Sequence, residues 1–230
     1  MESLNCESLG TREVNHRLRS LPDGGHARLV QPRGRHNLAV GLSSRISIDI
    51  AGNAGYFVGG LCGNRDGTGP DIVVDGFVGW AVGENLMGGS VRVRGSTSQS
   101  AGSSARGGTI VIEGDASLRA GISLKGATLA IGGNAGAMSG FMAQSGVILI
   151  GGNAGHGLGD SLYEAIIYVA GRIDSLGSDA VITEMSDEDV LTVKELVSET
   201  GFDHIDPTGV TKVTSARQLY HFSTHNHGAY

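Results

Sequence analysis

Four histidines near the end of this 230-residue chain are the first candidates for chemistry. They are His204, His221, His225 and His227. The spacing His225-x-His227 could direct two imidazoles toward one metal ion, because His is a common ligand of zinc and other transition metals. Neither a cysteine nor a well-spaced carboxylate accompanies these histidines. We therefore favour a tail that contacts solvent or a partner over a metal site.

The two cysteines, Cys6 and Cys62, are the candidate nucleophiles. Cys62 falls in a column of residues that we assign below to the interior, and no histidine shares its register. A small buried core residue is therefore predicted at this position rather than a nucleophile. Cys6 lies in a polar leader and is expected to be exposed. Two cysteines cannot form a disulfide framework or a four-cysteine metal site.

Glu84 and Asp160 are the carboxylates whose positions correspond within the repeat described next. Acid and base carboxyls of glycosidases lie within about 10 Å of each other. These two are four repeats apart, about 19 Å at roughly 4.8 Å per repeat, so they cannot act as a pair. Hexapeptide acyltransferases also stack glycine-punctuated turns, but the period here does not divide into sixes. The sequence therefore predicts no catalytic, cofactor-binding or metal-ligating residue in this chain.

A 19-residue repeat is the element that positions Cys62, Glu84 and Asp160. A branched aliphatic residue, any residue and then glycine recur at a constant spacing of 19, and one earlier copy lies 24 residues upstream of its successor. The seven copies are Ile50-x-Gly52, Val74-x-Gly76, Val93-x-Gly95, Ile112-x-Gly114, Ile131-x-Gly133, Ile150-x-Gly152 and Val169-x-Gly171. A second glycine column accompanies them at Gly59, Gly83, Gly102, Gly121, Gly140 and Gly159. Such a period indicates a solenoid of stacked turns.

Each copy carries a short strand in which branched residues alternate with others, as Ile110 and Ile112 do. Nineteen residues trace roughly 60 Å of extended chain, enough for one turn of short sides and too little for a unit that contains a helix. We therefore predict an all-β fold, a right-handed parallel β-helix of about seven turns with short helical caps at both ends. One column is assigned to the interior: Cys62, Leu86, Ala105, Leu124, Ala143 and Leu162.

The chain divides into a capping segment at residues 1–40, the β-helix at 41–180, and a C-terminal helix and tail at 181–230. A helix is predicted from Ser186 as N-cap to a stop at Gly201. Its first turn is acidic, and Val190, Val193 and Val197 lie on one face. This helix should cover an end or a side of the rod. Asp75, Arg94 and Glu113 are expected to form an outward ladder of alternating charge.

Composition narrows the classes of partner. The net charge of −6 and the 5% share of aromatic residues argue against a nucleic-acid partner. The polar N-terminus lacks an apolar leader, and no apolar run approaches the length of a membrane span, so no membrane partner is expected and a cytoplasmic location is predicted.

The spacing inside each turn resembles that of a known family. Gly52, Gly55 and Gly59 make G-x-x-G-x-x-x-G, which is repeated in full by the turns beginning at Gly76, Gly133 and Gly152. The pattern is similar to the β-helical domain at the C-terminus of the glutamate synthase large chain, which also occurs as a subunit of formylmethanofuran dehydrogenase. Further stretches resemble the free-standing form of this domain, most closely the middle subunit of N-methylglutamate synthases (methylamine-glutamate N-methyltransferases). They are "TREVNHRL", "HNLAVGL", "FMAQSG", "GDSLYEA" and "LYHFSTHNHGAY".

The resemblance implies a scaffold without catalytic residues of its own. Its implied partners are a glutamine-amidotransferase-like subunit and a glutamate-synthase-like subunit that contains FMN and an iron-sulfur cluster, so no cofactor is expected in this chain. Three alternatives stay open: a scaffold subunit of glutamate synthase, a subunit of formylmethanofuran dehydrogenase, and a self-associating structural rod. The five extra residues in the longer copy fall within the polar loop 63–70, which we expect to contact a partner.

Overall fold

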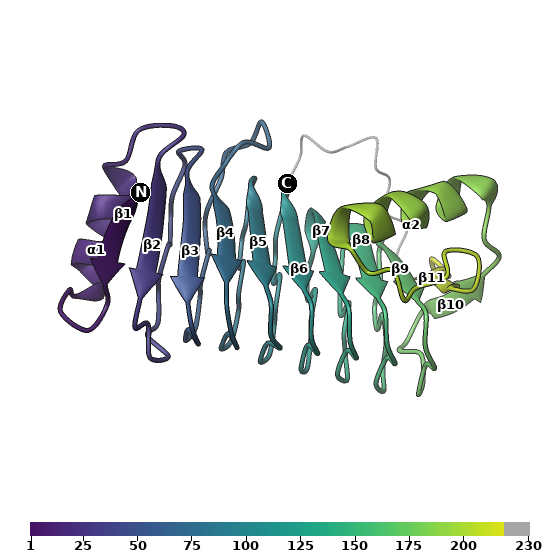
Figure 1. The fold of residues 1–230 in the computed structure, drawn as a ribbon. Coiled ribbons are helices and arrows are strands. Elements are labelled where there is room, and N and C mark those ends of the chain that lie inside the picture. Colours follow the sequence, from purple (N-terminus) through teal and green to yellow (C-terminus); the bar gives the residue numbers. More distant parts are fainter. Residues whose placement is uncertain (219–230) are drawn as a thin grey trace.

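The alternating branched residues form parallel strands that lie side by side in one long sheet (Figure 1). The computed structural model describes residues 1–218 and shows a parallel β-solenoid of about eight turns with two α-helices. Nine strands follow one another in parallel along the sheet. They are β1 (Glu2–Asn5), β2 (His26–Val30), β3 (Ser47–Ala51), β4 (Asp71–Val74), β5 (Ser90–Val93), β6 (Thr109–Ile112), β7 (Lys125–Ile131), β8 (Ser145–Ile150) and β9 (Ile166–Val169). The prediction of a parallel β-helix is confirmed.

The prediction of seven turns is wrong by about one, because an additional turn lies within the segment assigned to the N-terminal cap. Strand β2 pairs with β3 in parallel, with Leu29 opposite Ile50. Leu38 and Leu42 continue this turn and are buried in the same core as Cys62. The distance from Leu29 to Ile50 is 21 residues instead of 19, so a search for a fixed period does not detect this copy.

The predicted interior column is confirmed, since all its members, from Cys62 to Leu162, are buried in one continuous core. The glycine column from Gly59 to Gly159 forms a set of corners with positive φ. Gly121, for example, has a φ of +70°, and a Cβ atom there would lie 2.5 Å from Ile148 Cδ1. The turn therefore requires glycine here both for its backbone conformation and for lack of space.

The N-terminal end is closed by β1 and by helix α1 (Thr11–Arg19) (Figure 1). Val14 and Leu18 of this helix are fully buried in the solenoid core. The helical cap predicted at this end is therefore present. The leader before it, which looks polar in sequence, forms strand β1 and pairs with β2.

The C-terminal end combines three elements. Strand β10 (Ala180–Thr183) leads to helix α2 (Asp187–Thr200), and the chain returns as strand β11 (Thr211–Ser215). Strand β11 inserts between β9 and β10 and runs antiparallel to both. The predicted boundaries of the helix are confirmed: Ser186 is the N-cap, and Gly201 ends the helix in the left-handed conformation with a φ of 77°.

Helix α2 lies across the outer face of the sheet over β7 to β9 (Figure 1). It covers a second apolar cluster formed by the outward residues of β6 to β9, which are Val111, Ala130, Leu149 and Tyr168. The predicted apolar face of the helix is only partly correct. Val193 is buried, and the other buried residues of the helix are Asp189, Leu196 and Thr200. Val190 and Val197 are only half-buried. The helix is therefore rotated toward Asp189, for a reason given below.

Candidate functional site

The predicted carboxylate pair is not brought together. Glu84 precedes β5 and Asp160 precedes β9, so strands β5 to β8 separate them by about 19 Å. The Asp160 carboxylate accepts hydrogen bonds from the Ser178 backbone N–H at 3.0 Å and from the Ser161 hydroxyl at 2.8 Å. These bonds, that from Ser178 foremost, lower the pKa of Asp160. The carboxylate is thus engaged in holding a turn.

The two cysteines are both buried and unpaired. The Cys62 thiol donates to the Ala39 carbonyl at 3.1 Å, and burial raises its pKa to about 11. This agrees with the predicted role as a small core residue. The predicted exposure of Cys6 is wrong: its side chain is fully buried, because it follows β1 in register with Leu4 and faces the core. Desolvation raises the pKa of this thiol, and the charge of Arg35 lowers it to a smaller extent.

Of the four predicted histidines, only His204 lies within the described residues. Its Nε2 is 3.0 Å from the Gly132 carbonyl oxygen, so this nitrogen donates, and its ring contacts Phe202 at 5.9 Å between centroids. His221, His225 and His227 lie outside the described residues. Within residues 1–218 no group of three or more His, Cys, Asp and Glu side chains could hold a metal ion.

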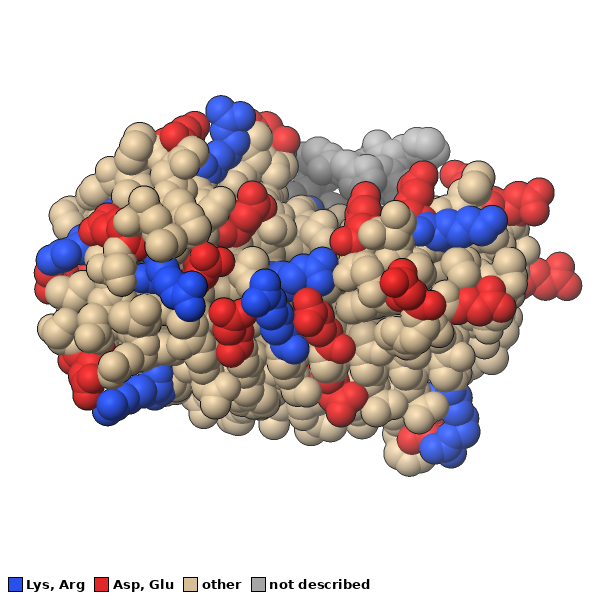
Figure 2. Space-filling model, viewed as in Figure 1, with Lys and Arg blue, Asp and Glu red and all other residues tan. Residues whose placement is uncertain are grey.

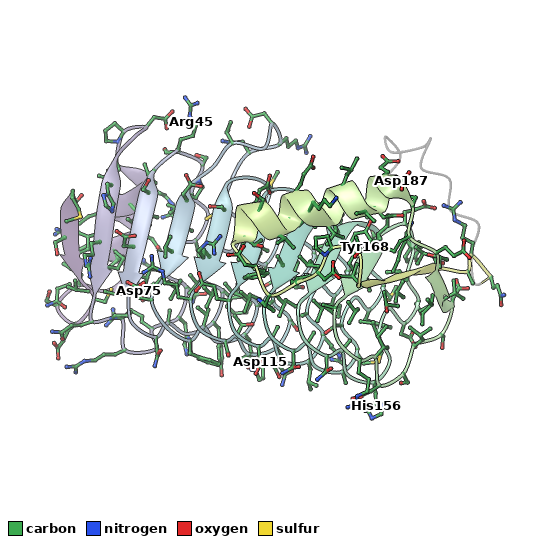
Figure 3. All side chains as sticks on the ribbon, turned by 45° about the vertical axis from the view of Figure 1, so that its right-hand side comes forward. Arg45, Asp75, Asp115, His156, Tyr168 and Asp187 are labelled. Atoms are coloured by element: carbon green, nitrogen blue, oxygen red, sulfur yellow. The ribbon has the colours of Figure 1, made fainter. Side chains whose placement is uncertain are left out.

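The predicted charge ladder is present in part. Arg94 pairs with Asp75, which Figure 3 labels on the sheet side of the rod. Glu113 does not continue the ladder and instead accepts a hydrogen bond from Arg92 at 3.0 Å. Arg92 also donates to the Thr200 carbonyl at 3.1 Å, at the C-terminal end of α2. The positive charge of Arg92 therefore stabilises the helix terminus.

Sequence reasoning missed the buried polar cluster around Asp189. This carboxylate accepts hydrogen bonds from the Tyr168 hydroxyl at 2.6 Å, from Lys212 Nζ at 2.7 Å and from the Ser186 hydroxyl at 2.6 Å. Burial alone would raise the pKa of Asp189, but its donors, with Lys212 first among them, lower it well below the ordinary value. Desolvation and the bond to Asp189 raise the pKa of Tyr168. The cluster joins α2, β9 and β11 and explains the rotation of the helix.

The loop predicted to contact a partner projects beside β4 at the upper edge of Figure 1. It is internally ordered: the Asp66 carboxylate accepts from the Thr68 backbone N–H at 3.0 Å and from its hydroxyl at 2.7 Å, and Asn64 Nδ2 donates to the Ser43 carbonyl at 2.9 Å. Arg65 is exposed at the tip. The loop therefore projects from one turn of the rod in a conformation that its own hydrogen bonds stabilise.

Fold and surface together define a class: a glycine-cornered parallel β-solenoid whose buried polar groups hold structural elements in place. Neither of its two helices, within the described residues, is long and apolar enough to cross a membrane. No family model matches the chain. It is 44% identical to Protein GlxC of Rhizobium meliloti (strain 1021) over 233 aligned positions, which cover the whole of both chains. The chain therefore belongs to the family of Protein GlxC.

Proposed function

We propose that this chain is the non-catalytic scaffold subunit of a glutamate-synthase-like enzyme, and specifically of an N-methylglutamate synthase. Such an enzyme converts glutamate and methylamine to N-methylglutamate and ammonia. The observation that carries the proposal is the G-x-x-G-x-x-x-G pattern, whose last glycine in each copy forms a corner of the solenoid that occupies most of the described residues. The 44% identity to Protein GlxC across the whole of both sequences supports this proposal.

The contacts of the reactive groups fit a supporting role. Cys62 is buried with a raised pKa, Asp160 holds a turn, and Asp189 anchors α2. An iron-sulfur cluster held by four cysteines does not fit a chain with two, both buried. We therefore assign the cluster and FMN to a glutamate-synthase-like partner, and amide chemistry to an amidotransferase-like partner. A cytoplasmic location belongs to the same proposal.

The test is affinity purification of the tagged chain from its native cells, followed by identification of the bound proteins by mass spectrometry. A flavin-containing subunit and an amidotransferase-like subunit should co-purify, and the complex should form N-methylglutamate from glutamate and methylamine. The control is the same pair of partners prepared without this chain. Formation of glutamate alone would indicate a glutamate synthase, molybdopterin-containing partners a formylmethanofuran dehydrogenase, and homo-oligomers alone a structural rod.

The isolated chain gives a second test. It should be colourless, should retain no flavin through gel filtration and should turn over neither glutamine nor methylamine. A flavin spectrum that stays with the isolated chain would contradict the assignment of the cofactor to a partner.

A further inference from the structure

One lateral face of the solenoid carries most of its exposed apolar side chains. Seven of the ten exposed large hydrophobic residues within residues 1–218 lie on it: Tyr56, Phe57, Leu61, Phe77, Trp80, Leu118 and Met142. We define the lateral face as the segments of five successive turns that follow strands β3 to β7, which are residues 53–61, 77–85, 96–104, 115–123 and 134–142. An apolar concentration of this kind marks an interaction surface.

Charge is nearly absent from the lateral face. Its five segments contain three charged residues, Glu84, Asp115 and Arg119, although 17% of the whole chain is charged. Figure 2 shows charged side chains gathered over the sheet side, whereas the lower edge, where the turns leave the strands, carries few. Asp115, labelled at this edge in Figure 3, accepts from the Asn134 backbone N–H at 2.6 Å. A partner with many charges would lose their hydration here without gaining ion pairs.

The aromatic part of the lateral face is already ordered. Tyr56 stacks on His36 with ring centroids 4.2 Å apart and on Trp80 with centroids 5.1 Å apart. His36 belongs to the preceding turn and Trp80 to the following one, so both faces of the Tyr56 ring are covered and its edge is exposed. Trp80 itself is 47% exposed. A fixed row of aromatic side chains loses little conformational freedom on binding.

Three of the large residues occupy backbone positions that disfavour them, namely Phe57, Leu61 and Met142. Phe57 has a φ of 63° and Leu61 a φ of 58°, and both side chains are exposed. The same positions one turn later hold Ala81 and Asn85, also with positive φ. Asn tolerates this conformation better than Leu does. Neither Phe57 nor Leu61 gains burial in the core, and strained residues cluster at functional sites.

The lateral face runs along five turns of the rod, about 24 Å at roughly 4.8 Å per turn, and it bends around the corner glycines from Gly59 to Gly140. The large side chains are concentrated in the first two turns, about 10 Å along the rod. Self-pairing of two antiparallel copies centred on these turns would set the remaining turns of the face against the N-terminal end of the second copy and not against its lateral face. A longer partner surface can cover it completely.

We propose that the lateral face is the permanent docking surface for a different subunit, one that presents an uncharged, apolar surface along five turns of the rod. This inference rests on the proposed function, in which the chain assembles with catalytic subunits. It is distinct from the loop at residues 63–70, which is polar and projects from a single turn.

The repeat supplies the substitutions for the test. In the variant Leu61→Asn/Phe77→Ser/Trp80→Gln, each residue is replaced by the one that the next turn carries at the same position, namely Asn85, Ser96 and Gln99. The fold is therefore expected to tolerate all three changes. The matched control is Ile182→Thr/Leu191→Gln, which removes two apolar side chains of similar exposure, 59% and 58%, outside the lateral face.

Native mass spectrometry and affinity measurements on the complex isolated from cells decide the proposal. We expect the triple variant to unfold at the temperature of the parent and to bind its partner at least tenfold more weakly, with the control within twofold of the parent. A triple variant that assembles like the parent would overturn the proposal that the lateral face is a docking surface, without affecting the proposed function. A parent chain recovered alone, or only as homo-oligomers, would overturn both.

Discussion

Gly121 offers a direct test of how the corners of the solenoid are built. Its φ of +70° disfavours any residue with a Cβ, and a Cβ there would lie 2.5 Å from Ile148 Cδ1 and 3.4 Å from Leu129 Cδ2. Two costs are therefore expected for Gly121→Ala. The backbone cost is about 1 kcal/mol, and crowding in a packed core adds about 1–3 kcal/mol.

The two costs can be separated with matched variants. Gly24 has a similar φ of +77°, and a Cβ atom there would have no other atom within 4 Å, so Gly24→Ala should lose only the backbone part, about 1 kcal/mol. Ile148→Val removes the atom that would clash and should itself cost about 0.5–1.5 kcal/mol. In the background of Ile148→Val, the cost of Gly121→Ala should fall to about 1 kcal/mol. The double-mutant cycle should thus show a favourable coupling of about 1–3 kcal/mol.

Urea unfolding followed by circular dichroism and by the fluorescence of Trp80, the single tryptophan, measures these free energies. Coincident transitions of the two probes are required, because solenoids can lose two-state behaviour. Equal losses for Gly121→Ala and Gly24→Ala, together with zero coupling to Ile148→Val, would refute the proposed crowding at this corner.

Three further predictions concern other parts of the molecule. Because the pKa of Asp189 is lowered in the folded state, its contribution to the free energy of unfolding is present above pH ~4 and is lost as the pH falls below that value. Lys212→Met should reduce this loss of stability at low pH in a measured profile of stability against pH. Native Cys62, with a pKa of about 11, should resist iodoacetamide at pH 8 and react fully in urea; rapid native labelling would contradict its burial. Deletion of residues 65–69 should lower the stability of the isolated chain by about 1 kcal/mol, because it removes the Gly67 carbonyl that accepts a hydrogen bond from the Gly89 N–H. The deletion should also weaken assembly with the partner subunits. An unchanged subunit affinity would show that the loop makes no contact with them.

The strands could be predicted from the sequence wherever the period is rigid. Ile110 and Ile112, like their equivalents in other copies, alternate with outward residues and lie in the core as expected. The first turn was not predicted because its residues precede their equivalents in the next turn by 20 or 21 positions and not by 19. Leu38 and Leu42, for example, each precede their equivalents, Val58 and Cys62, by 20 residues. A search that tolerated small changes of period would have found it.

The C-terminal elements were harder to predict because they depend on contacts between distant segments. The caps of α2 are local signals and were read correctly at Ser186 and Gly201. Its rotation depends on Asp189, which a pattern of apolar residues places in solvent, and which is buried because Lys212 and Tyr168 meet it from β11 and β9. Strand β11 carries little alternation and exists through its pairing with β9 and β10.

In a regular repeat, a position where one turn departs from the residues of the other turns can indicate a function. Positions in the core must satisfy the stacking of neighbouring turns, so their residues stay apolar or nearly so, as in the column from Cys62 to Leu162. Positions on the surface have no such constraint, and the turn that follows Phe57 and Leu61 carries Ala81 and Asn85 at the same positions. The presence of large, strained and exposed residues there follows neither from packing nor from backbone preference. The lateral face is therefore the part of the molecule whose residues the fold does not explain, and contact with another subunit is the explanation that its exposed apolar side chains and low charge support.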